Sequence, residues 1–579
     1  MTGRGDGRPP LPLSLRADGD RWVSVRAQRT VLGVVHNVTS ATRLLDLLAV
    51  FAGDPRVETV FTCTGSSAFD AGTAEFLTAR GMVQVPWAQA KAGKFDVAIA
   101  TSRGGDLHGL RTPLIGAPHG AGYGKRLAPE GGDGPAVSFG LSPEWLVHDG
   151  EVVPSAIVLS HEEQRERLAA SCPQAVPRSV VAGDPCCDQL QASAPFRADY
   201  RRALGVRPGQ RLVVVSSTWG GGSVLSDGDP DRAVLRRALA ELPLDEYRVL
   251  AAVHPNAWYG HGAWQMQSWL APLVEHGLIL PVPDSQTWKA ALLAADRLLG
   301  DHGSLTLYGV SLGVPAVLGA FAEAKVAVPS PMARLGELLP RLSPHTGVQA
   351  QLEDAAARQP GDAELQDVRE ALTSHPGRSA ALLRQLFYGW LELPEPERPA
   401  VPSLVPLPAG TVGRALPAEP PVFAATGLRD GVAHLRRFPA ALQRRTAGRH
   451  LAGAHLLADV DHPDTEWVGS ADVLTVPVGR PLRTAGADAW GAVFRRYPGL
   501  ALLAIEQDAG GALLVLRDGR RLRAVWAGER PWWATAAAAA SVVHDHVMAV
   551  PGPAGADPVR IEVWTGDGCG TGLLDVAAG

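Results

Sequence analysis

The sequence has few cysteines, no excess of basic residues and no long hydrophobic run. Its five cysteines are spread irregularly over 579 residues, which argues against a disulfide scaffold or a four-thiolate zinc site and fits a reducing cytoplasm. The formal net charge is -5, so we expect no bulk binding of nucleic acid. No stretch reaches the roughly 18 apolar residues of a membrane span, so we expect at most peripheral contact with a membrane.

The first residues also lack the features of a secretory signal. Residues 1–29 mix arginines with aspartates and contain no apolar core, so we predict an irregular N-terminus on a cytoplasmic protein. Hydrophobic residues make up 46% of the chain and charged residues 20%, as in a globular protein with ample core. At roughly 100–200 residues per domain, the length predicts two to four domains.

The sequence does contain two series of short apolar runs that alternate with helical patterns, which is typical of parallel α/β domains. In the first series, residues 30–190, we predict strands at 31–35, 59–63, 95–100, 113–117, 156–159 and 179–182. In the second, residues 205–345, we predict strands at 211–216, 247–253, 278–282, 297–299 and 315–318. The ligand site is expected in the cleft between the two domains.

Three further segments complete the predicted organisation. Residues 346–393 have helical spacing, and residues 394–421 are rich in proline and predict a semi-rigid linker. Residues 422–579 contain strand patterns at 473–478, 501–506, 512–517 and 521–525, with turns at 508–511 and 518–520. We predict a small α+β domain there and assign it no role.

Four short motifs stand where predicted strands end. They are HGAGYGK from His119 to Lys125, SSTWGGG from Ser216 to Gly222, His254-Pro255, and GDHGS from Gly300 to Ser304. Open α/β sheets bind ligands at the carboxyl ends of their strands, where helix N-termini present free N–H groups to anions. The ordered set therefore predicts a site for an anionic ligand.

The first motif has the residue types of a proton acceptor. The unperturbed pKa of a histidine, near 6.5, suits His119 to a general base, and Lys125 can pair with a phosphate. The alternative is a glycine-rich connector with a surface histidine.

The other motifs have the residue types of a phosphate cradle. Hydroxyls and bare N–H groups at Ser217, Thr218 and Trp219 can hold a diphosphate, although a simple loop between domains fits the same residues. His254 either faces the ligand or caps a helix. Ser304, after Asp301 and Gly303, begins a helix whose N–H groups would face the cleft.

The order of these motifs resembles the CDP-glycerol glycerophosphotransferase family, the teichoic-acid polymerases and primases of the GT-B superfamily, and more distantly the UDP-N-acetylglucosamine 2-epimerases. The resemblance covers about residues 30–390 and implies two facing Rossmann-like domains. It rests on 119–125, 183–185 (GDP), 217–219, 253–255, 301–304 and 312–315 (LGVP). The sequence departs from the family at Ala252, where a basic residue is expected, and at His302-Gly303, which replace an aromatic residue and a serine.

The resemblance implies a transferase that moves a glycerophosphate-like or glycosyl group from a nucleotide-activated donor to an acceptor hydroxyl, as in the synthesis of a cell-envelope polymer. His119 would be the catalytic base. The donor would be bound by Lys125, Ser217, Thr218, Trp219, His254, Asp301, Gly303 and Ser304. The nucleotide-diphosphate donor is then a substrate, and no tightly bound cofactor is expected.

Two other readings remain open from the sequence. The same fold supports an epimerase or hydrolase of nucleotide sugars. The missing basic residue at Ala252 also fits a catalytically inactive GT-B scaffold that binds a protein partner. The nucleotide base and the acceptor are not defined by the sequence.

Two clusters outside these motifs have the residue types of metal ligands. One is Asp459, Asp461, His462 and Asp464, and the other is His544-Asp545-His546. His544 and His546 share a face only in a strand, whereas the alanines at 536–540 favour a helix. We interpret the clusters as a surface loop and a helix end, and predict no metal site.

Overall fold

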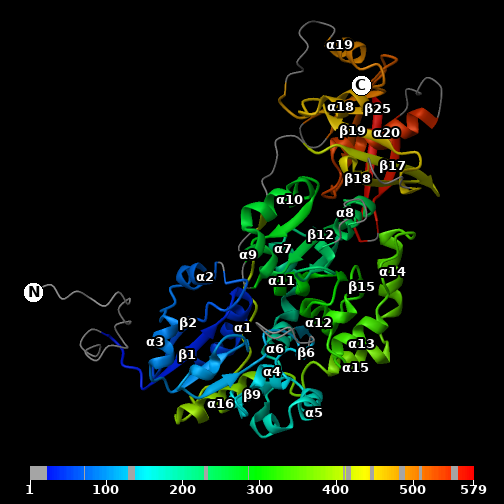
Figure 1. Cartoon of the computed structure of the whole chain (residues 1–579). Helices are drawn as coiled ribbons and strands as arrows, with labels where there is room; N and C mark the ends of the chain where they lie inside the picture. The colour runs from blue at the N-terminus through cyan, green and yellow to red at the C-terminus, as the bar shows by residue number, and fades with distance from the viewer. Residues whose placement is uncertain are drawn as a thin grey trace, which may run out of the picture.

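The computed structural model describes residues 23–70, 72–127, 137–226, 233–283, 286–408, 411–412, 419–443, 449–480, 489–507, 511–549, 558–566 and 568–579. Most of the predicted irregular N-terminus, parts of the predicted linker and the turn expected at 508–511, apart from its last residue, lie outside these ranges. In Figure 1 the first domain is blue to cyan, the second is green, and the C-terminal part, yellow to red, lies at the far end of the second.

The first domain contains a six-stranded sheet in the order β10-β9-β4-β3-β1-β2. Its strands are all parallel, and β3 and β4 are buried along their whole length, as expected of a sheet covered on both faces. The strands are β1 Arg29–Val35, β2 Val57–Cys63, β3 Val97–Ala100, β4 Leu114–Gly116, β9 Ala156–Leu159 and β10 Ser179–Val181. Each lies where the sequence predicts a strand.

Helices and two small hairpins complete this part of the chain. The helices are α1 Val38–Leu48, α2 Thr73–Ala79, α3 Trp87–Ala92, α4 Pro143–Leu146, α5 Glu162–Ser171, α6 Pro185–Ser193 and α7 Arg197–Ala203. The hairpins are β5 Arg126–Leu127 with β6 Val137–Ser138, and β7 Val147–His148 with β8 Glu151–Val152. The Asn37 side chain begins α1 by accepting a hydrogen bond from the Ser40 N–H.

The second domain repeats this design, with a sheet in the order β15-β14-β11-β12-β13-β16. Its strands are β11 Arg211–Ser217, β12 Tyr247–Val253, β13 Leu278–Pro281, β14 Arg297–Gly300, β15 Ala316–Leu318 and β16 Thr411–Val412. All pairs are parallel except β13 with β16, which comes from the proline-rich segment. The predicted fold class, a pair of facing α/β domains followed by a smaller domain, is confirmed.

The helices of the second domain run from α8 to α15, and α16 returns to the first domain. They are α8 Val234–Glu241, α9 Pro255–His261, α10 Ala263–Glu275, α11 Thr287–Ala294, α12 Ser304–Ser311, α13 Pro331–Leu338, α14 Val348–Arg358, α15 Ala363–Glu370 and α16 Ser379–Leu391. Phe387 of α16 stacks on Phe51 with 5.7 Å between ring centroids, and Figure 1 shows α16 beside the first domain. The chain therefore crosses between the domains more than once.

The C-terminal part is a closed barrel with the strand order β17-β18-β24-β25-β23-β22-β21-β20-β19. The strands are β17 Val422–Arg429, β18 Val432–Pro439, β19 His455–Asp459, β20 Val473–Val476, β21 Leu502–Glu506, β22 Ala512–Leu516, β23 Arg521–Ala527, β24 Val559–Trp564 and β25 Thr571–Ala578. The helices are α17 Ala440–Gln443, α18 Thr465–Ser470, α19 Ala489–Arg496 and α20 Ala536–Ala549. Helices and strands were both expected here, but the closure into a barrel was not.

The barrel wraps around α20. This helix contacts strands β17 to β23, and its alanines share one buried core with inward-facing residues of the strands. Small side chains allow the backbone of a helix to approach the surrounding wall closely. The barrel is joined to the second domain by an ion pair of 2.6 Å between Arg437 of β18 and Asp245.

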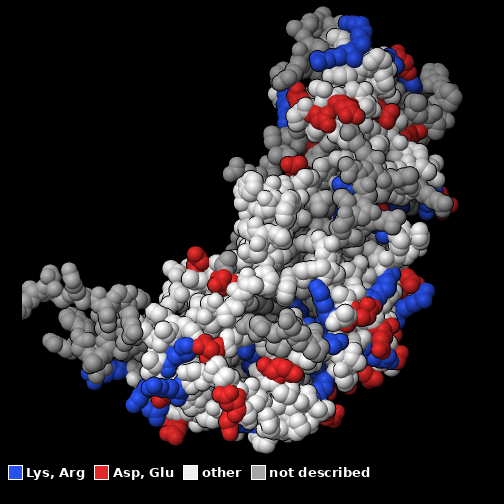
Figure 2. Space-filling model, viewed as in Figure 1, with Lys and Arg blue, Asp and Glu red and all other residues white. Residues whose placement is uncertain are grey.

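The surface charge and the lengths of the helices relate to two expectations from composition, namely no bulk binding of nucleic acid and no membrane span. Figure 2 shows lysine and arginine side chains interspersed with aspartate and glutamate on the visible face, with no single basic patch. Among the described helices, none is long and apolar enough to cross a membrane.

Candidate active site between the two α/β domains

A cleft of about 1090 Å³ lies between the carboxyl ends of the two parallel sheets. The first domain contributes the N-terminal turns of α1 and the segments that follow β3 and β4, and the second contributes the segments that follow β11, β12 and β14. Of the predicted site residues, the cleft is lined by His119, Lys125, Ser217, Thr218, His254, Gly303 and Ser304. The sequence motifs therefore meet in one place.

His119 lies after β4, on the segment that reaches toward the second domain. Its ring packs edge-on against Phe139, with 5.4 Å between centroids. Burial, followed by the charges of Lys125 and Arg43, lowers the pKa of His119 to about 3. The ring is therefore neutral at physiological pH and has a lone pair that can accept a proton.

The glycines after His119 allow this segment to approach the second domain. A Cβ atom on Gly120 would lie 2.5 Å from the Ser304 hydroxyl, so a larger residue would push against the N-terminus of α12. The Ala327 N–H donates a hydrogen bond of 3.0 Å to the Gly124 carbonyl, across the domain boundary. The segment is a contact between domains as well as a wall of the cleft.

Lys125 is the lining cation with the fewest partners. Its ammonium lies 5.3 Å from the centroid of the Trp219 ring, and it has no ion pair within the described residues. Burial and the charge of Lys325 lower the pKa of Lys125 to about 8, although Asp301 opposes that shift. The lysine is largely protonated near neutral pH and is free to bind an anion.

Trp219 lies behind the cleft, in contact with Phe69 and Lys125, although the sequence predicted it among the donor-binding residues. Its ring contacts Phe69 of the first domain edge-on, with 4.8 Å between centroids, and the Lys125 ammonium lies over it. It is not among the residues that line the cleft. Trp219 therefore positions the lysine and does not face the ligand.

Asp301 also differs from the expectation, because it is fully buried behind the cleft. Its Oδ2 accepts hydrogen bonds from the N–H groups of Thr218, at 2.7 Å, and Val224, at 3.3 Å, and its Oδ1 accepts one from Gly303, at 2.9 Å. Burial raises its pKa, whereas these N–H groups lower it. Asp301 holds the 217–224 loop against the start of α12, and has no direct path to a ligand.

The 217–224 loop contributes Ser217 and Thr218 to the wall of the cleft. The Ser217 hydroxyl accepts a hydrogen bond from the Leu225 N–H at 3.1 Å, which fixes the loop. The Thr218 hydroxyl is buried and has no hydrogen-bond partner among the described residues. An unpaired buried hydroxyl at the wall of a cleft is suited to a polar ligand.

His254 combines the two roles considered from the sequence. Its Nδ1 accepts a hydrogen bond of 3.1 Å from the Asn256 N–H, so the side chain caps α9. In a neutral ring the proton is then on Nε2. Burial, with the charges of Lys125 and His119, lowers the pKa of His254 well below its usual value. His254 therefore offers an N–H donor to the cleft without a positive charge.

The N-terminus of α12 lines the same cleft as His119. Gly303 is the N-cap residue, and no side chain caps the helix. Gly303 and Ser304 both line the cleft. The first N–H groups of this helix are therefore open to an anion.

Sequence reasoning missed a buried polar network at the base of the cleft. Arg43 of α1 donates hydrogen bonds to Asp46, Asp184 and the hydroxyl of Tyr308, which lies on α12. Lys289 of α11 donates to Asp46 at 2.8 Å. A signal was present, because Arg43 falls on the apolar face of α1 beside Leu44 and Leu47, where a charge requires a partner.

Fold and cleft together define a pair of α/β domains, followed by a barrel, with a cleft between the first two domains. Arg43, Arg103 and Lys125 line that cleft, and no aspartate or glutamate is among its described lining residues.

Comparisons with known proteins give similarities among solved structures only. No family model matches the chain, and neither does any curated protein. The wall teichoic acid polymerase TagF is 13% identical, with a TM-score of 0.45 over 64% of this chain and 90% of that one. MnaA of S. aureus with UDP is 12% identical, with a TM-score of 0.39 over 64% and 99%. The UDP-GlcNAc 2-epimerase from Neisseria meningitidis is 12% identical, with a TM-score of 0.39 over 63% and 99%.

Proposed function

We propose that this protein transfers a glycerophosphate-like or glycosyl group from a nucleotide-activated donor to an acceptor hydroxyl. The observation that supports this most is that one cleft is lined both by a neutral histidine, His119, and by an uncapped helix N-terminus at Gly303 and Ser304. A proton acceptor and an anion site that share one cleft are the two requirements of such a transfer.

The donor diphosphate is assigned to the second domain. The N-terminus of α12, Thr218 and His254 supply hydrogen-bond donors on residues that line the same cleft. Lys125 adds a positive charge from the first domain. Because none of the described lining residues is a carboxylate, a diphosphate enters without like-charge repulsion.

The acceptor is assigned to the first domain, next to His119. Its hydroxyl oxygen attacks phosphorus or the sugar carbon, the bond to the nucleotide leaving group breaks, and the hydroxyl proton moves to a ring nitrogen of His119. A bound diphosphate would offset the charges of Lys125 and Arg43, which lower the His119 pKa, and would thus make the histidine a stronger base when the donor is present.

Binding of the donor is tested first, by thermal shift with CDP-glycerol, CDP-ribitol, UDP-sugars, GDP-sugars and free nucleotides. A ligand at about 100 times its dissociation constant adds roughly 2.7 kcal/mol of stability. We expect one nucleotide class to shift the native protein and His119→Ala, and to shift His254→Ala less. No shift with any nucleotide would contradict the proposal and favour a non-catalytic scaffold.

Turnover is tested with the donor found in that screen. We expect release of nucleotide only with an acceptor present, and loss of turnover in His119→Ala with nucleotide binding retained. His462→Ala is the matched control, because the half-buried His462 follows β19 in the barrel and does not line the cleft. Product formed from the donor without any acceptor would instead assign an epimerase or hydrolase to the cleft.

A further inference from the structure

A histidine of the barrel points inward and lies far from the cleft. His455 begins β19, where it pairs with Ala424 of β17. Alternate residues of a strand share a face, and Leu457, two residues on, packs in the core that contains α20. His455 therefore faces α20 from the wall, and it is only 4% exposed.

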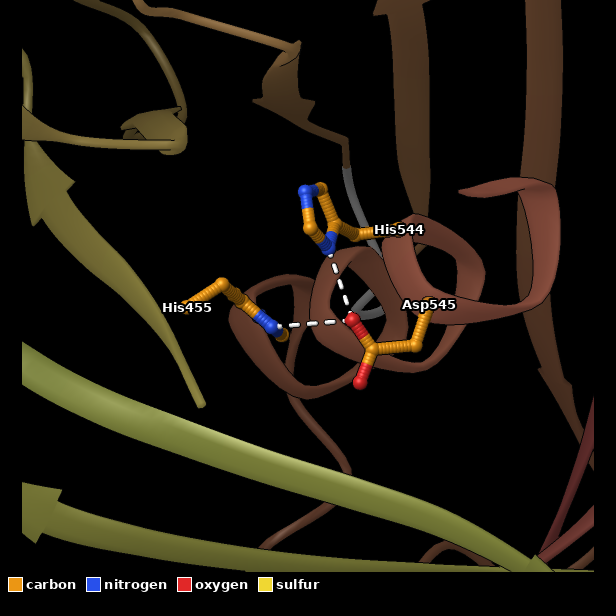
Figure 3. Close-up of side chains that lie close together, drawn as sticks. All are labelled: His455, His544 and Asp545. Atoms are coloured by element: carbon orange, nitrogen blue, oxygen red, sulfur yellow. Dashed lines mark hydrogen bonds and ion pairs between the residues drawn. The ribbon is translucent and has the colours of Figure 1, made fainter. Parts of the chain in front are cut away.

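Helix α20 brings two more donor side chains to the same point. One carboxylate oxygen of Asp545 lies 3.1 Å from Nδ1 of His455 and 2.8 Å from Nδ1 of His544. The two imidazole rings are 4.3 Å apart between centroids. Figure 3 shows the three side chains directed at one another, His455 from its strand and the other two from the helix.

The buried ring of His455 lacks a full set of hydrogen-bond partners. Nε2 of His455 makes no hydrogen bond within the described part of the chain although it is fully buried, and the equally buried Nδ1 has only the Asp545 oxygen at 3.1 Å beside it. Leaving such a group unpaired costs about 1–3 kcal/mol. A ligand that accepts a nitrogen lone pair would remove that cost.

We propose that His455, His544 and Asp545 bind a divalent transition-metal ion, with zinc as the best match. One donor atom from each residue lies within 4.8 Å of the other two, and ligands held at about 2.0–2.2 Å from zinc are separated by roughly 4 Å or less. Two imidazole nitrogens and one carboxylate oxygen are a donor set that zinc favours. Three protein ligands leave a further coordination position for water.

A fourth residue orients the carboxylate. The Thr426 hydroxyl of β17 donates a hydrogen bond to the second oxygen of Asp545, as outer residues commonly do for metal-binding carboxylates. The ion would link β19 to α20, with β17 attached through this hydrogen bond. The proposal is independent of the cleft, because all four residues belong to the barrel.

The test uses the full chain, stripped with a chelator, loaded with zinc, dialysed and analysed by mass spectrometry for metal content. We expect one zinc per chain in the native protein and in His546→Asn, whose exposed histidine lies on the same helix. We expect none in His455→Asn or His544→Asn. Equal zinc content in all four proteins, or none in the native protein, would overturn the proposal.

A second measurement covers variants that fold poorly. Cobalt added to the stripped native protein should give visible absorption bands of a low-coordinate site, which zinc then abolishes. Thr426→Val keeps all three ligands, and we expect it to weaken zinc binding by roughly 10- to 100-fold in a competition titration. Cobalt bands characteristic of the free aqueous ion would contradict the site.

Discussion

Lys289 of the second domain donates hydrogen bonds to both carboxylate oxygens of Asp46 in the first, at 2.8 and 3.0 Å. Both side chains are buried, with side-chain exposures of 2% and 7%. With Arg43 and Tyr308, the pair fixes how α1 meets α11 and α12 below the cleft. The two walls of the site are therefore positioned relative to each other by a buried polar network.

Removing one partner of this pair should be costly. Lys289→Met leaves the Asp46 carboxylate without one of its two cations, and breaking a buried ion pair typically costs about 3–5 kcal/mol. We expect a loss of that size, measured by urea unfolding followed by circular dichroism. Arg202→Met, in an ion pair whose side chains are 77% and 47% exposed, is the control and should change stability little.

Replacing both Lys289 and Asp46 by apolar residues should cost less stability than replacing Lys289 alone. The double variant Lys289→Met/Asp46→Leu should regain part of the lost stability, because Asp46 is then no longer a buried charge short of a partner, while Arg43 loses Asp46 but keeps Asp184 and Tyr308. If the single variant is as stable as the control, the ion pair does not hold the domains together.

Asp301→Ala should disturb the 217–224 loop without removing a residue that lines the cleft. Three backbone N–H groups lose their acceptor, at about 1–3 kcal/mol for each one left unpaired. We expect lower stability and weaker nucleotide binding together, measured by thermal shift and calorimetry. Asp367→Asn, on the exposed side of α15, should change neither. Unchanged nucleotide affinity in Asp301→Ala would argue against the 217–224 loop as the donor site.

Donor binding should weaken as the pH rises through 8. Lys125, with a pKa lowered to about 8 by burial, loses its proton and hence its attraction for a diphosphate. We expect calorimetry to give a lower affinity at pH 9 than at pH 7 for the native protein and for Lys94→Met, an exposed lysine outside the cleft. Lys125→Met should bind weakly at both values. If Lys125→Met showed the same pH dependence as the native protein, Lys125 would not be the group whose loss of a proton weakens donor binding.

Stability should fall as the pH is lowered below 6.5. Burial lowers the pKa of His36 and His302 to about 4, that of His119 to about 3, and that of His254 well below the usual value. Between these values and 6.5 the unfolded chain binds protons that the folded protein does not, so acid favours unfolding.

The fall in stability between pH 7 and pH 5 depends on how many protons the buried histidines bind on unfolding. Near pH 5 these four histidines contribute up to about four protons to the difference in binding between the unfolded and folded states. Unfolding midpoints measured from pH 7 to pH 5 should fall steadily, and less in His36→Asn than in the native protein. A midpoint that is independent of pH over this range would contradict the burial of these rings.

The sequence predicted the two sheets well because their strands are continuous apolar runs bounded by turns. His119, Thr218, His254 and Ser304 line one cleft, as expected of residues that follow parallel strands at one edge of a sheet. Asp301 and Trp219 are not among the lining residues, because a residue type in a motif does not distinguish a side chain at the cleft wall from one that supports the loop. Arg43 and Lys289 were missed because the network joins them to residues distant in sequence, Asp184 and Tyr308 for Arg43 and Asp46 for Lys289.

The barrel was harder to predict. Strands β21 to β23 form antiparallel hairpins whose turns the sequence marks, but β17 and β24 are more polar, and the pairing of β18 with β24 joins distant parts of the chain. His455 lies in an apolar strand, far in sequence from His544 and Asp545. Only the closure of the barrel around α20 brings them together.

The closure of the barrel around α20 also sets the order in which its strands can pair during cotranslational folding. Strands β24 and β25 follow α20 in the sequence but lie between β18 and β23 in the barrel. A nascent chain that has just emerged through α20 thus exposes an alanine-rich helix and two unpaired strand edges. The enclosure of α20 is a late event in cotranslational folding, and translation arrested before residue 558 should give a product prone to chaperone binding and proteolysis.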